Sequence, residues 1–164
     1  MAQMLNSTVV PALALAASLA ELASLVDCVT DLDYMSRSPE TETGTDADGA
    51  SLGAHVASCL RHVSVALSAA LARPPEPIPA LEHSRQRGLS ALRAAVRDLD
   101  ALATRAMSEP LTLDPTHDPQ GARLERTAAT GRALGLLLPQ VRHHKAQALR
   151  CLSSTERFRV SSVA

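Results

Sequence analysis

Two histidines and a cysteine on one predicted helix form the first group of residues that could do chemistry. His55, Cys59 and His62 follow one another at spacings of four and three, and Ser58 lies beside them. Because a helix repeats every ~3.6 residues, these side chains share one face. Neutral imidazoles and a thiolate are ligands that zinc prefers, and imidazole also suits nickel. The spacing therefore predicts either a face of metal ligands or a buried polar seam.

A second pair of histidines, His143 and His144, lies in a later predicted helix. The inward positions of that helix recur every three or four residues: Leu134, Leu137, Val141, His144, Ala148 and Cys151. His144 therefore lies on an apolar stripe. An inward histidine is either a metal ligand or a core residue satisfied by hydrogen bonds, and one ligand alone does not make a site. The residues leave both interpretations open.

Four helices are predicted to position these residues, because apolar side chains recur at helical spacing in four segments. Ser51 is a natural N-cap for the second of them, and Pro74 ends it. The expected helices run from Ser7 or Thr8 to Leu32, from Leu52 to before Pro74, from Ala80 to Met107, and from Thr127 or Ala128 to Leu152.

The composition favours an all-α fold. Apolar residues make up 46% of the 164 residues, but there are only one Tyr, one Phe and no Trp. The core must therefore consist of Leu, Ala and Val, which suits closely packed helices. We predict a four-helix bundle at residues 1–152 and a loosely ordered tail at 153–164. A long polar loop over 36–50 follows the first helix, and Leu111–Leu113 with Leu124–Arg126 could form a short β-hairpin before the fourth helix.

Charge and cysteine usage exclude several classes of function. The formal net charge is -1, so there is no basic field to attract nucleic acid or anionic lipid. We expect no membrane span and, because no Lys or Arg precedes the N-terminal apolar run, no signal peptide. The three cysteines form no CxxC pair, which is typical of a protein from a reducing cytoplasm. One lysine among many arginines is typical of a bacterial genome rich in GC.

Two segments of the chain resemble the DinB/YfiT-like family of bacterial proteins. Ser51-Leu52-Gly53-Ala54-His55 through His62 is similar to that family's second-helix segment, which begins Ser-Ile-Gly-x-His and ends on a further histidine. Arg132-Ala133-Leu134 through His143-His144 resembles its fourth-helix segment, Arg-Glu-Leu…His-x-x-His-His. The resemblance spans almost the whole chain and implies a DinB-like four-helix bundle.

The resemblance also implies a divalent metal, zinc or nickel, held by three histidines from the second and fourth helices. The corresponding positions in this chain are Ser58, Gln140 and His144. Ser and Gln are weak, neutral ligands, so the site is expected to be reduced or rearranged, or its metal to be absent. His55 and His62 stay on the face of Ser58. Together with His144, and with Cys59 nearby, they are the candidate metal ligands.

Two classes of function follow from this resemblance. The first is a small metal-dependent enzyme, a hydrolase or thiol transferase, that acts on a small molecule between the second and fourth helices. The second is a non-catalytic module that has lost the family metal site and serves in ligand binding or homodimerisation. The substitutions at Ser58 and Gln140 favour the second class, whereas the histidines retained on both helices favour the first.

Overall fold

A computed structural model describes residues 2–36, 50–71, 81–108 and 119–161 of the chain. Within these residues every regular element is helical, which confirms the predicted all-α class. The elements are α1 (Ala2–Cys28), α2 (Asp31–Met35), α3 (Leu52–Ala70), the short 3₁₀-helix η1 (Leu81–His83), α4 (Arg85–Ser108) and α5 (Pro119–Ser161).

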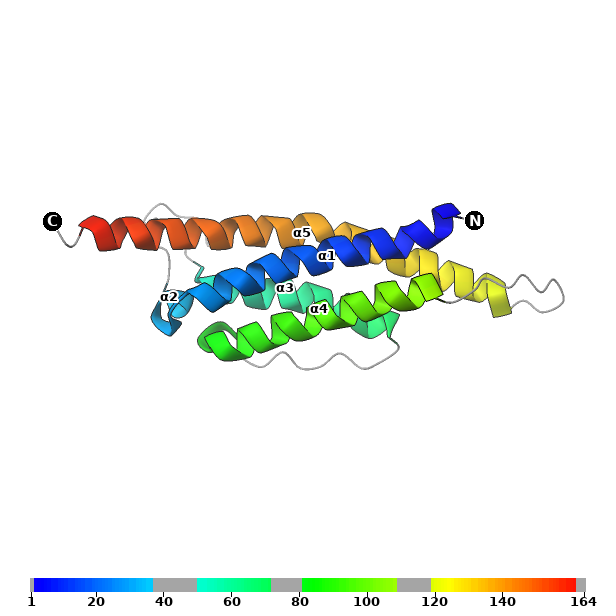
Figure 1. Ribbon diagram of the computed structural model, residues 1–164, viewed down its shortest axis with the longest axis horizontal. Coiled ribbons are helices and arrows are strands. Elements are labelled where there is room, and N and C mark those ends of the chain that lie inside the picture. The colour runs from blue at the N-terminus through cyan, green and yellow to red at the C-terminus, as the bar shows by residue number, and fades with distance from the viewer. Residues whose placement is uncertain (1, 37–49, 72–80, 109–118, 162–164) are drawn as a thin grey trace.

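The four long helices pack side by side as a bundle. Helices α1 and α5 run in one direction and α3 and α4 in the other, as Figure 1 shows by the colour along each ribbon. Helix α1 packs against α4 and α5, and α3 packs against the same two helices. Each long helix therefore has two neighbours, and the apolar stripes meet in the middle.

The core has the composition predicted from the sequence. The stripe expected on the second helix is buried, and the first is buried as far as Val26. The stripe on the fourth helix is buried except at Leu137 and His144, which are half-buried. The side chains without any exposed surface include Ala12, Leu15, Leu19, Leu22, Val26, Leu52, Val56, Val63, Leu92, Leu99, Ala103, Leu134, Val141 and Ala148. Burial of such aliphatic side chains supplies the main driving force for folding.

The first helix ends earlier than predicted. It stops at Cys28 instead of Leu32, and α2 begins three residues later. Thr30 is the cause, because its hydroxyl oxygen accepts from the Asp33 amide at 3.2 Å while the Asp33 carboxylate accepts from the Thr30 amide at 3.4 Å. This reciprocal capping box starts a new helix and breaks the old one.

Arg85 fixes the end of α1 from the start of α4. Its Nη1 donates to the carbonyl oxygens of Val26 and Asp27 at 3.2 and 3.5 Å, and its Nε donates to the Asp31 carboxylate at 2.7 Å. The guanidinium thus satisfies carbonyls that a helix end leaves without partners. The third predicted helix is also divided, because Ser84 separates η1 from α4 and accepts from the Arg87 amide.

The prediction of a β-hairpin before the last helix is wrong for the second strand of that hairpin. Leu124–Arg126 lies inside α5, which begins at Pro119 instead of Thr127 or Ala128. Proline is favoured at the first position of a helix, and most of the residues that follow it here are strong helix formers. The first strand, Leu111–Leu113, and residues 37–49 of the predicted polar loop at 36–50 lie outside the described residues. The helix continues to Ser161, so the segment predicted as a loosely ordered tail begins as helix.

The absence of a membrane span stays a prediction, although one helix among the described residues has the length and composition of such a span. Thr8–Cys28 in α1 is long and apolar enough to cross a membrane by length and composition. In this structure its leucines at 15, 19 and 22 are fully buried against the bundle, and a core helix passes the same test.

Tyr34 connects α2 to three other elements. Its side chain is fully buried, and its hydroxyl donates to the Leu81 carbonyl oxygen at 2.9 Å. Gly53 and Gly88 make room for the ring: a Cβ at Gly53 would lie 2.8 Å from Tyr34 Cε1 and 2.6 Å from the Glu82 carbonyl oxygen, and a Cβ at Gly88 would overlap the Tyr34 hydroxyl. Burial raises the pKa of Tyr34 to about 12, so the hydroxyl remains a donor at neutral pH.

We expect Gly88→Ala to destabilise the protein by about 1–3 kcal/mol, because the added methyl group overpacks the Tyr34 site. Gly135→Ala is the matched control. A Cβ at Gly135 meets no atom within 4 Å, so this substitution should stabilise α5 by about 0.5–1 kcal/mol. Urea unfolding followed by circular dichroism measures both changes. Equal destabilisation by the two substitutions would contradict the packing described for Tyr34.

Tyr34→Phe should lower the free energy of unfolding by about 0.5–1.5 kcal/mol, because it removes the shorter of the two hydrogen bonds to the Leu81 carbonyl oxygen and leaves only that from the Ser84 amide at 3.4 Å. It should also reduce the penalty of Gly88→Ala, since the hydroxyl that overlaps the new methyl group is gone. A double-mutant cycle measures this coupling. Strict additivity of the two substitutions would show that the hydroxyl does not limit the space at Gly88.

Candidate functional site

His55 of α3 and His144 of α5 meet in the interior between their helices. Their Nδ1 atoms are 3.4 Å apart, and the ring centroids are 5.6 Å apart. His55 is 7% exposed and His144 is half-buried. A hydrogen bond at this contact requires one Nδ1–H to donate to the other, unprotonated Nδ1, so that the two rings would adopt different tautomers.

Local structure at the start of α3 places His55. The Ser51 hydroxyl accepts from the Ala54 amide at 3.2 Å, which confirms Ser51 as the predicted N-cap. Gly53 lets the Glu82 backbone approach closely, so this first turn lies against η1. On α5, the fully buried Val141 and Ala148 flank His144 along the same stripe.

Two further histidines border the pair on its exposed side. The His62 ring stacks on that of His144 with centroids 6.3 Å apart and planes inclined by 20°. The His143 ring meets His144 edge-on at 5.5 Å. Both side chains are exposed, whereas His55 is not. His144 therefore lies at the centre of a group of four imidazoles, the histidine cluster.

Both rings of the central pair are held in the neutral form. Burial lowers the pKa of His55, and His144 and His143 lower it further. Burial likewise lowers the pKa of His144, with His143 and His62 as secondary causes. Neutral imidazole is the form that binds a metal or accepts a hydrogen bond.

Cys59 is a buried thiol at the contact between α3 and α5. Its Sγ donates to the Val141 carbonyl oxygen at 3.9 Å, and burial raises the pKa of the thiol to about 12. The protonated thiol therefore packs as a small buried side chain.

The other two positions implied by the family resemblance contribute little to the cluster. Ser58 is half-buried on α3, and Gln140 is exposed on α5. In the part of the chain that the structure describes, no group of three His, Cys, Asp or Glu side chains is arranged to hold a metal ion. A site with three protein ligands is therefore not formed by these residues.

The distance between the two Nδ1 atoms of the central pair matches that between two ligands of one metal ion. Two nitrogens that bind one tetrahedral zinc at about 2.0–2.1 Å lie about 3.4 Å apart. The observed Nδ1–Nδ1 distance is 3.4 Å. The pair can thus form either a direct hydrogen bond or two corners of a metal site, and the two states exclude each other because both use the same lone pairs.

An ion pair next to the cluster was not predicted from the sequence. Lys145, the only lysine in the chain, donates to the Glu21 carboxylate of α1. This interaction lowers the pKa of Glu21. It ties α5 to α1 at the residue after His144. The only feature of the sequence that sets Lys145 apart is that it is a single lysine among arginines, and the sequence alone does not show which carboxylate it contacts.

Comparisons with protein-family models, curated proteins and solved structures find no match to this chain.

The protein should lose stability as the pH falls below about 6.5. The pKa of His55 and that of His144 are lower in the folded protein than the ordinary value of 6.5, so the unfolded chain takes up protons first. The contribution of the two neutral imidazoles to the free energy of unfolding is complete above pH 6.5, and it is lost as the pH falls through the folded-state pKa values of His55 and His144. His144→Gln should flatten the dependence between pH 7 and pH 5, measured as the free energy of urea unfolding.

His83→Gln is the control for this pH series, because His83 is exposed and outside the cluster. It should keep the pH dependence of the unsubstituted protein. The same slope in His144→Gln and His83→Gln would show that the His55–His144 pair does not control acid stability.

Proposed function

We propose that the chain is a DinB-like bundle protein in which His55 and His144 form a reduced binding site for a divalent metal, zinc or nickel. The observation that supports it best is the 3.4 Å separation of their Nδ1 atoms across α3 and α5. The bundle of four long helices and the neutral state of both rings agree with this proposal.

The proposed activity is that of a hydrolase or thiol transferase acting on a small molecule. A divalent metal with two protein ligands keeps coordination positions open, where it would polarise a substrate oxygen or activate water or a thiol. The protein residues supply the rest: α3 and α5 hold the two imidazoles in place, and burial keeps them neutral. Substrate would approach from the exposed side, where His62 and His143 lie.

The second candidate is a non-catalytic module that binds a ligand or forms a homodimer. The half-buried Ser58 and the exposed Gln140 favour it, because neither offers a third strong ligand. In this case the His55–His144 contact is a buried hydrogen bond that joins two helices. Exposed apolar side chains that could contribute to a dimer contact are Val10, Leu13, Val65, Leu136 and Leu149. For both candidates we propose a bacterial, cytoplasmic location without nucleic-acid or membrane partners.

Metal content decides between the two candidates. The protein, purified without a histidine tag and equilibrated with zinc or nickel, should retain close to one metal ion per chain by elemental mass spectrometry. His144→Ala should abolish metal retention, because it removes one of the two ligands. His143→Ala is the matched control, since it removes the adjacent, exposed histidine and should leave the metal content unchanged.

Two results of the metal analysis would contradict the proposed metal site. Absence of metal from the unsubstituted protein after incubation with excess zinc and nickel would overturn the metal proposal. Equal loss from both variants would show that metal binds adventitiously to surface histidines. Either result would favour the non-catalytic module, and the oligomeric state by analytical ultracentrifugation would be the next measurement.

A further inference from the structure

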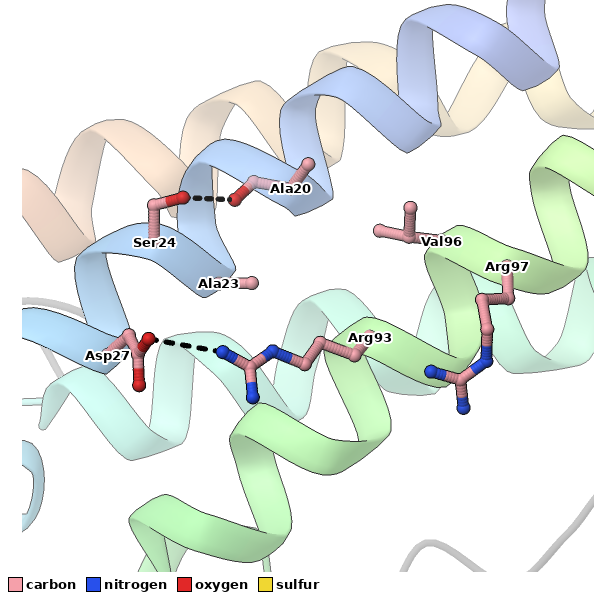
Figure 2. Close-up of a pocket in the computed structure, with 7 residues that line it drawn as sticks. All are labelled: Ala20, Ala23, Ser24, Asp27, Arg93, Val96 and Arg97. Carbon is pink, nitrogen blue, oxygen red and sulfur yellow. Dashed lines mark hydrogen bonds and ion pairs between the residues drawn. The ribbon is translucent and has the colours of Figure 1, made fainter.

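A groove on another face of the bundle lies between α1 and α4. Its volume is about 350 Å³, and Figure 2 shows the side chains that line it. Helix α1 contributes Ala20, Ala23, Ser24 and Asp27, and α4 contributes Arg93, Val96 and Arg97. The histidine cluster belongs to α3 and α5, so this groove is separate from the proposed metal site.

The groove combines an apolar floor with a cationic edge. Ala20, Ala23 and Val96 offer only aliphatic surface, and Ala23 is 7% exposed. The Ser24 hydroxyl is already used, since it donates to the Ala20 carbonyl oxygen at 3.0 Å. The polar groups left to recognise a ligand are therefore the two arginines and Asp27.

The two arginines differ in their partners. Arg93 Nη2 donates to the Asp27 carboxylate at 3.1 Å, and both side chains are about half exposed, at 56% and 53%. Arg97 forms no hydrogen bond or ion pair with any residue that the structure describes, and in Figure 2 its exposed side chain runs along α4, away from Ala20 and Ala23. One guanidinium is thus balanced by a carboxylate, whereas the other offers its donors to an external anion.

We propose that this groove binds a small organic carboxylate with an aliphatic body. The exposed side chain of Arg97 would turn toward the groove, where its planar donors match both oxygens of the carboxylate. The aliphatic body would lie over Ala20, Ala23 and Val96. The volume is that of a small-molecule site, and apolar walls with a few polar groups are typical of such sites. The Arg93–Asp27 pair holds the rim in place and repels a second anionic group through Asp27.

The structure also indicates how this binding should respond to solution conditions. Both arginines are exposed. Their attraction for a carboxylate is therefore screened by salt, while the apolar contact is not. Affinity should fall with ionic strength but not disappear.

The test is a titration of isotope-labelled full-length protein with sodium octanoate, followed by the backbone amide signals in NMR. We expect saturable shifts at Ala20, Ala23, Val96 and Arg97. Octanol, which lacks the charge, and acetate, which lacks the aliphatic body, should both bind much more weakly. Arg97→Gln should weaken octanoate binding about tenfold, the loss expected for a charge-assisted hydrogen bond.

Arg87→Gln is the matched control, because Arg87 is exposed on α4 but does not line the groove. It should leave the affinity unchanged. The proposal is overturned if millimolar octanoate produces no saturable shifts at these residues, if octanol binds as tightly, or if Arg87→Gln weakens binding as much as Arg97→Gln. The proposal does not depend on the metal site, and neither arginine substitution should change metal content.

Discussion

The packing of Tyr34 constrains the half of the bundle on which the candidate site is built. One ring from α2 fills the space left by two glycines, and its hydroxyl satisfies a backbone carbonyl of η1. The ring thereby fixes where α3 starts relative to α4. His55 follows Gly53 by two residues, so a displacement at Gly53 would move the imidazole as well. The chemistry proposed between α3 and α5 therefore depends on a contact made by a short helix elsewhere in the chain.

The two polar regions of the protein lie between different pairs of helices. The histidine cluster lies between α3 and α5, where burial keeps the imidazoles neutral and the thiol of Cys59 protonated. The groove between α1 and α4 is open, and its arginines are exposed to water. Lys145 and Glu21 connect the two regions, because they join α5 to α1 beside His144. The buried region of low dielectric constant thus favours neutral side chains, whereas the exposed region of high dielectric constant carries charged ones.

Local signals in the sequence predicted the helices and their buried faces, whereas spatial relations could not be predicted. Ser51 and the aliphatic stripes determine α3 largely by themselves, so their prediction is confirmed. The Thr30–Asp33 capping box was also a local signal, but the apolar periodicity of the first helix hid it. The strand expected at Leu124–Arg126 was wrong because turn residues were given more weight than helix propensity. Inward positions for His55 and His144 were predictable, but their pairing depends on how α3 and α5 are rotated and aligned, and neither sequence segment encodes that alone.

Tyr34 also makes the protein optically simple. The chain has one tyrosine and no tryptophan, so its near-ultraviolet absorption and fluorescence come almost entirely from one buried ring. These signals report whether α2 is docked against η1, α3 and α4, while far-ultraviolet dichroism reports helix content throughout the chain. Comparison of the two spectroscopic signals during unfolding separates the release of this one junction from the melting of the helices. The natural sequence therefore contains a single-site probe that needs no label.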